Sequence, residues 1–275
     1  MTPISAWTPI LAPMPFSGPR PDTGRRLPPA LHDLLRSSLL TAKNFGFVIF
    51  SVIMPLLLYV VFTGLYGRAA GPDGVNWAAM IMVSMAAYGS LGAAMGGGAQ
   101  LAVERKSGWF RQLSITTLPP TSFLWAKAAV IMLIVLPALL LVFAAGFGIG
   151  GVRAPLTQWL TPLALMWLSL VPLAILGIVI GLWVKAEVVQ GLTTLCLLAL
   201  ALLGGLCFPT QIMPSVMQSV AHLLPSYWLA ELGRYPFLPG AAFPWAGAGV
   251  LLAWTAGLSV LGALGYRQAA IHSKR

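Results

Sequence analysis

Apolar residues of this chain gather in six long runs that are separated by short polar breaks. Each run is long enough for a helix to cross a hydrocarbon core of about 30 Å, which takes about 20 residues. The pattern therefore predicts an all-α integral membrane protein with six transmembrane helices. We place them at Phe47–Tyr66, Trp77–Leu101, Leu124–Gly150, Trp159–Val184, Val188–Phe208 and Phe243–Tyr266.

A different pattern precedes the first run. Residues 1–30 contain eight prolines, and this composition predicts a disordered arm. After the arm, leucines recur at helical spacing among polar residues. We expect an amphipathic helix in the membrane interface here, and the alternative is an extension of the first span. The residues that carry this helix are Leu31, Leu34, Leu35, Arg36 and Leu39.

Composition supports a membrane location independently of the runs. Apolar residues make up 58% of the chain and charged residues 8%, and the mean hydropathy is +0.87. A soluble domain carries roughly 25% charged residues, so this chain has too few charges to cover a water-facing surface. Lipid is therefore expected to cover most of it.

The basic residues predict how the chain is oriented. The formal net charge is +10, from 16 Lys and Arg against 6 Asp and Glu. With six spans, both termini lie on one side, and all basic residues except Arg68, Arg153 and Arg234 fall on that side. The positive-inside rule then places both termini in the cytoplasm. The same rule explains the positive charge without a nucleic-acid partner.

Sequence motifs give no sign of a catalytic centre or a cofactor site. The two cysteines and three histidines are not spaced as metal ligands, and no GxxxxGK[ST] phosphate-binding loop occurs. Every Asp and Glu lies at or beyond the end of a predicted span, which leaves no proton relay inside the membrane. We therefore expect no metal or cofactor in this chain, and an energy source outside it.

The longest polar break on the predicted cytoplasmic side is Glu104–Lys127, ERKSGWFRQLSITTLPPTSFLWAK. Gly108 permits a turn out of the second span. Trp109, Phe110 and Leu113 then share one face of a short helix that Pro119 and the proline after it end. Such a helix is either a docking surface for a cytoplasmic partner or a helix held by anionic lipid, and its composition leaves both readings open.

This loop resembles the signature loop of ABC-2 type permeases, in which a charged cluster, a glycine and a short helix precede a proline break and a lysine. Gly204–Arg234, with its Phe-Pro and proline-punctuated short segments, resembles the family's region after the fifth span. The resemblance covers residues 31–275, and Trp109 and Ser107 depart from the usual residues. It implies short external helices between the fifth and sixth spans, and an ATPase-coupling role for Glu104, Arg105, Lys106, Gly108, Trp109, Phe110, Arg111 and Leu113. Lys185 and Glu187 form a possible second coupling contact.

As a member of this family, the chain would be the transmembrane subunit of an export-type ABC transporter and not itself an enzyme. The resemblance implies two P-loop nucleotide-binding subunits, which carry ATP and magnesium, and a second permease, either an identical copy or a related chain. The expected location is the inner membrane of a prokaryote, with lipid as the remaining contact. Apolar span residues favour drug-like or lipid cargo, and a polysaccharide or glycolipid is the alternative. A membrane-embedded enzyme or a passive channel is disfavoured, because no catalytic cluster or selectivity filter is evident.

Overall fold

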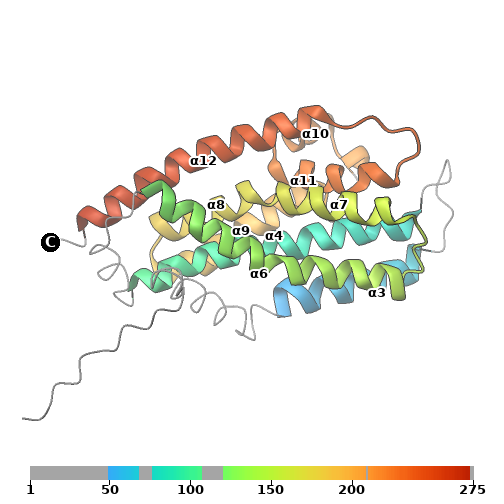
Figure 1. Ribbon diagram of the computed structural model, residues 1–275, viewed down its shortest axis with the longest axis horizontal. Helices are drawn as coiled ribbons and strands as arrows, with labels where there is room; N and C mark the ends of the chain where they lie inside the picture. Colours follow the sequence, from blue (N-terminus) through green and yellow to red (C-terminus); the bar gives the residue numbers. More distant parts are fainter. Residues whose placement is uncertain (1–48, 68–75, 107–119, 209, 273–275) are drawn as a thin grey trace, which may run out of the picture.

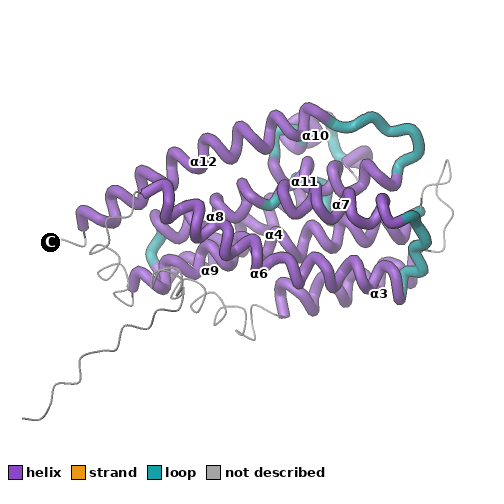
Figure 2. The backbone as a smooth tube through the Cα atoms, viewed as in Figure 1, coloured by secondary structure: helices purple, strands orange, loops and turns teal. Residues whose placement is uncertain are grey.

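Helices make up the regular structure in the computed structural model, which describes residues 49–67, 76–106, 120–208 and 210–272 (Figures 1 and 2). The arm at 1–30 and the predicted interfacial helix lie outside these residues. The long helices run roughly along one direction, so the chain turns at the two ends of a bundle. The main elements are a π-helix η1 (Ile49–Ile53), α3 (Met54–Tyr66), α4 (Trp77–Lys106), α6 (Pro120–Gly148), α7 (Leu156–Ser169), α8 (Val171–Trp183), α9 (Ala186–Leu203), α10 (Ser215–Ala221), α11 (Pro225–Arg234) and α12 (Trp245–His272).

Five helical segments are long and apolar enough to cross a membrane. These segments are Trp77–Lys106, Leu124–Gly148, Leu156–Trp183, Ala186–Leu203 and Trp245–Tyr266. They agree with five of the predicted runs to within a few residues at most ends. Among the described residues, the first run appears as a shorter apolar helix, Ser51–Tyr66. Five candidate spans are therefore observed, and the sixth stays a prediction.

The predicted fourth span consists of two helices that meet at Leu170. Pro172 has no N–H to donate to the Leu168 carbonyl oxygen, so one hydrogen bond of the helical ladder is missing beside Leu170. The Leu170 N–H donates to the carbonyl oxygens of Met166 and Trp167, both at 3.2 Å. Beside the break, the Trp167 indole nitrogen donates to the Met132 carbonyl oxygen of α6 at 3.0 Å. The break is therefore braced by the neighbouring helix.

Helix α4 forms the centre of the bundle, and its closest partner is α8. Gly98 of α4 meets Gly177 of α8 so closely that a Cβ atom on Gly98 would lie 2.3 Å from the Gly177 carbonyl carbon. Gly181 lies one turn further along α8 and packs against the Gly98 carbonyl oxygen. Small residues four apart let the two backbones touch, which is how helices pack when lipid gives no hydrophobic driving force. The α4–α8 pair is therefore the tightest contact of the core.

Helices α9 and α12 lie at the periphery. Few of their described side chains are buried, and the exposed residues of α9 include Val188, Leu192, Leu195, Leu198 and Leu202. In Figure 1, α12 runs along one flank of the bundle. The short helices α10 and α11 connect these two peripheral helices, in agreement with the predicted short helices between the last two spans. Helix α11 differs from α10 because it packs into the bundle, against α4, α7 and α12.

Candidate coupling site

Six of the charged residues singled out in the sequence meet at one end of the bundle. Helix α4 ends there and α6 begins, and the chain turns there from α8 into α9 (Figure 1). We call this region the charged end, and its residues are Glu104, Arg105, Lys106, Lys127, Lys185 and Glu187. Three interactions, described next, involve all of these residues except Lys185 and join four helices.

A buried ion pair lies at the base of the Glu104–Lys127 loop. The Lys127 ammonium donates to both carboxylate oxygens of Glu104, at 2.8 and 2.9 Å. The Lys127 side chain is 2% exposed and that of Glu104 is 12% exposed. A charge removed from water in this way is tolerated only while its partner is present. The pair therefore fixes the spacing between the end of α4 and the start of α6, and so the base of the loop.

Arg105 joins the end of α4 to the end of α8. Its guanidinium donates to the carbonyl oxygen of Gly181 at 3.2 Å and to that of Leu182. Carbonyls in the last turn of a helix lack partners within the helix and carry its partial negative charge, so a cation is stabilised there. Arg105 thus caps α8 and ties it to α4 at the charged end.

An exposed ion pair connects the two predicted coupling contacts. Lys106 lies 2.7 Å from a carboxylate oxygen of Glu187, and their side chains are 67% and 58% exposed. Lys185 is also exposed and lies at the N-cap of α9. An ion pair in water contributes roughly 0–1 kcal/mol, so these groups exchange partners at little cost. They form a charged surface that a second protein is able to contact.

The remaining predicted contact residues lie outside the described residues. These are Gly108, Trp109, Phe110, Arg111 and Leu113 in the loop, and Leu31, Leu34, Leu35, Arg36 and Leu39 of the interfacial helix. Their roles stay predictions. The structure does establish that α4 and α6, the helices that precede and follow the loop in sequence, are joined at the charged end by the Glu104–Lys127 pair.

Sequence reasoning missed the bond between Glu104 and Lys127. The signal was present, because Lys127 falls inside the apolar run Leu124–Gly150, and a charge at such a position usually has a partner. A second missed feature lies further from this end, where Arg234 is partly buried. The distribution of basic residues places Arg234 in an external loop and gives no sign that its side chain is buried.

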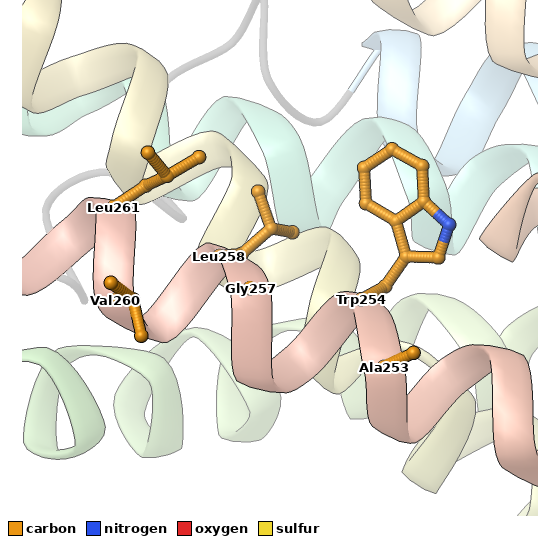
Figure 3. A pocket seen from close by; sticks show the side chains of 6 residues that line it. All are labelled: Ala253, Trp254, Gly257, Leu258, Val260 and Leu261. Carbon is orange, nitrogen blue, oxygen red and sulfur yellow. The ribbon is translucent and has the colours of Figure 1, made fainter.

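The bundle also carries an apolar hollow on α12 (Figure 3). Six residues of this helix line it, namely Ala253, Trp254, Gly257, Leu258, Val260 and Leu261. The Trp254 ring stands at one end of the hollow, and its indole nitrogen donates to the Leu223 carbonyl oxygen at 2.8 Å. Among the described residues, no group of His, Cys, Asp and Glu is arranged to hold a metal ion.

Comparison with known proteins identifies the class to which this bundle belongs. Residues 33–238, three quarters of the chain, match the family model described as "ABC-2 type transporter". The chain is 29% identical over 213 residues to a Bacillus subtilis (strain 168) protein named "Putative transport permease YvfS". That match covers 77% of this chain and 86% of the relative. The chain therefore belongs to the ABC-2 type transporter family and is a multi-pass membrane protein.

Proposed function

We propose that the chain is the transmembrane subunit of an ATP-driven exporter whose ATPase is a separate P-loop subunit. Family membership supports the transport role. The observation that supports the coupling role is the exposed Lys106–Glu187 ion pair, since it joins one residue from each of the two predicted contacts. The Glu104–Lys127 loop and the start of α9 then form one docking site on the cytoplasmic side.

In the proposed assembly, two permeases pair with two nucleotide-binding subunits. The exposed side of α9 supports a second permease at this helix, because it carries Gln190, Gly191 and Thr194 among its leucines. Polar and small residues gain more from contact with another helix than from contact with lipid tails. The second permease is either an identical copy or a related chain, and its approach also involves the first span.

The proposed cargo is apolar or amphipathic, either a drug-like molecule or a lipid. The hollow on α12 supports this class, because its lining is apolar and it lies on a span that lipid reaches. A polysaccharide or glycolipid is the second candidate. Its support is the group of aromatic rings at His222, Tyr227 and Trp228, since sugars stack on aromatic faces and neighbouring rings here are 4.8 to 6.3 Å apart.

The proposed topology places both termini in the cytoplasm of a prokaryotic cell, with the chain in the inner membrane. In a background without native thiols (Cys196→Ser/Cys207→Ser), we expect Arg153→Cys to react with a membrane-impermeant maleimide added to intact cells. Lys185→Cys is expected to react only after the cells are opened. Both positions are exposed, so burial does not limit the reaction. Labelling with the opposite sidedness would contradict this topology.

The proposed energy source is tested by ATP hydrolysis. Because the sequence has no phosphate-binding loop, we expect the purified chain neither to bind nor to hydrolyse ATP. Co-expression with its P-loop partner is expected to give a complex that hydrolyses ATP and moves cargo in proteoliposomes. Saturable ATP hydrolysis by the isolated chain, in a preparation free of contaminating ATPase, would overturn the proposal.

A further inference from the structure

The side chain of Arg234, at the end of α11, holds together three segments that are distant in the sequence. Its guanidinium donates to the Ser84 hydroxyl of α4 at 2.8 Å and to the Gly205 carbonyl oxygen, just beyond α9, at 3.0 Å. A third contact, at 3.4 Å, joins it to Glu231 on its own helix. The side chain is only 15% exposed. Burial lowers the pKa of the Arg234 guanidinium, and the Glu231 carboxylate opposes that shift.

The surroundings of Arg234 are built to receive it. Gly205 has φ +70°, a conformation that side-chain-bearing residues rarely adopt, and a Cβ atom there would lie 2.4 Å from Thr210. Next to Arg234, Gly233 packs so closely on Val83 and Met166 that its Cβ position lies 2.6 Å from both side chains. Both glycines therefore let the end of α11 approach α4 and the end of α9.

Helix α11 is also attached near its first residue. The Ser226 hydroxyl donates to the Leu200 carbonyl oxygen of α9 at 2.7 Å, and both atoms are buried. This bond and those of Arg234 fix α11 at both of its ends. Of the two attachments, only the one at Arg234 reaches α4.

Helix α4 connects this attachment to the charged end. Ser84 and Arg105 are 21 residues apart on one continuous helix, which corresponds to roughly 30 Å along its axis. A displacement of α4 at the charged end is therefore carried to Ser84, because a helix transmits motion along its axis as a rigid element. The Arg234 contacts are where such a displacement acts on α11.

We propose that Arg234 is a positioning residue for transport, and that its bonds to Ser84 and Gly205 form a latch that holds α11 against the bundle. The latch releases α11 when α4 moves. This inference rests on the proposed function, since it takes the motion of α4 from an ATPase bound at the charged end. Release exposes the packed face of α11, where Leu229 and Ala230 are fully buried.

Ala230→Cys in a Cys196→Ser/Cys207→Ser background provides a reporter for the latch, because the introduced cysteine is then the only thiol of the chain. Ala230 lies on α11 and is fully buried, so a cysteine at this position is shielded from maleimide while α11 packs against the bundle. We expect Arg234→Gln and Ser84→Ala, each added to this background, to increase the rate of labelling by a membrane-impermeant maleimide about fivefold or more. Arg234→Lys keeps the charge but lacks the fork of donors, so its rate should be intermediate.

The matched control is Ser90→Ala. Ser90 lies on the same helix as Ser84 and is fully buried, but its hydroxyl bonds only to Ala86 and Ala87 of α4 itself. The labelling rate of the Ser90→Ala variant should equal that of the parent chain. If Arg234→Gln does not fold, the labelling rate of Ser84→Ala tests the latch instead, because this variant removes a single hydroxyl. Equal rates in the parent, Ser84→Ala and Ser90→Ala, including no reaction in any of them, would overturn the latch.

A second measurement separates the latch from the proposed function. The assembly with Arg234→Gln should retain its ATPase subunit and hydrolyse ATP, yet move less cargo per ATP than the parent. Unchanged transport per ATP, with ATPase bound, would overturn the role of Arg234 in transport. Failure of the parent chain to bind any P-loop subunit would instead overturn the proposed function, and the labelling result would still report on the latch.

Discussion

Replacing either member of the buried Glu104–Lys127 pair alone is expected to destabilise the protein by about 3–5 kcal/mol. Lys127→Met removes the ammonium that bonds to both Glu104 carboxylate oxygens, and Glu104→Gln leaves a buried ammonium facing a neutral amide. Each variant removes one charge of a pair that lies largely away from bulk water, and the loss of this interaction is the source of the penalty. The expected result is a much lower yield of monodisperse protein and a lower thermal midpoint in detergent.

The double variant Glu104→Gln/Lys127→Met is expected to recover much of the loss. It removes both charges of the pair, and replacing a buried pair by neutral groups is often close to neutral for stability. The matched control is Lys106→Met and Glu187→Gln at the same end of the bundle. That pair is largely exposed, so each change should cost less than about 1 kcal/mol. Thermal midpoints of all six proteins, measured by fluorescence-detected size exclusion, give the comparison.

Two outcomes would contradict this account of the charged end. One is a double variant that is less stable than both single variants, since the two losses would then simply add. The other is equal loss from the buried and the exposed pair, which would mean that burial of Lys127 does not govern the energy.

The spans were predictable because a hydrocarbon core imposes a length and a polarity on every segment that crosses it. Five runs therefore agree with observed helices to within a few residues at most ends. The break at Leu170 lies beside Pro172, which lacks the N–H of one ladder hydrogen bond, whereas α6 runs unbroken through Pro137. The coarse fold thus follows from local composition, without knowledge of which helices are neighbours.

Contacts between distant segments were not predictable in the same way. The Lys106–Glu187 pair joins residues 81 positions apart, and the Arg234–Ser84 bond joins residues 150 positions apart. Apolar periodicity does not reveal such pairings. It indicates which face of a helix is buried, but not which other helix covers that face. The α4–α8 crossing at Gly98 and Gly177 is similar, since many glycines of the second span looked equally suited to it.

The position of α11 shows the same limit at a candidate site. Its sequence predicts a short external helix, and the structure contains a helix at Pro225–Arg234. This helix packs into the bundle because Gly233 fits against Val83 and Met166. These contacts arise only in the assembled fold and are not visible in the sequence. Arg234 was therefore assigned to the external loop, while its burial and its partners were not foreseen.

The second large effect is expected from the loop at Glu104–Lys127. Phe110→Asp/Leu113→Asp places two carboxylates on the apolar face of the predicted docking helix. These residues lie outside the predicted spans, so insertion and folding should be preserved. An apolar face that fills a pocket of the ATPase contributes a large part of the binding energy, and its loss should reduce ATPase association about tenfold or more and abolish transport.

Ser107→Asp/Gln112→Asp is the matched control for this variant. It adds the same two negative charges to the same loop, but at polar positions. We expect it to bind the ATPase nearly as well as the parent. A helix that merely rests on anionic lipid would behave differently, since both variants would then show a modest, salt-dependent loss of membrane contact with the ATPase still bound.

Co-purification of the ATPase with the permease from one detergent extract tests the central claim most directly. The parent chain and Ser107→Asp/Gln112→Asp are predicted to recover the P-loop subunit in equal amounts, and Phe110→Asp/Leu113→Asp is predicted to recover about a tenth or less. Equal recovery from all three proteins, with unchanged transport, would contradict the claim that this loop couples ATP hydrolysis to export.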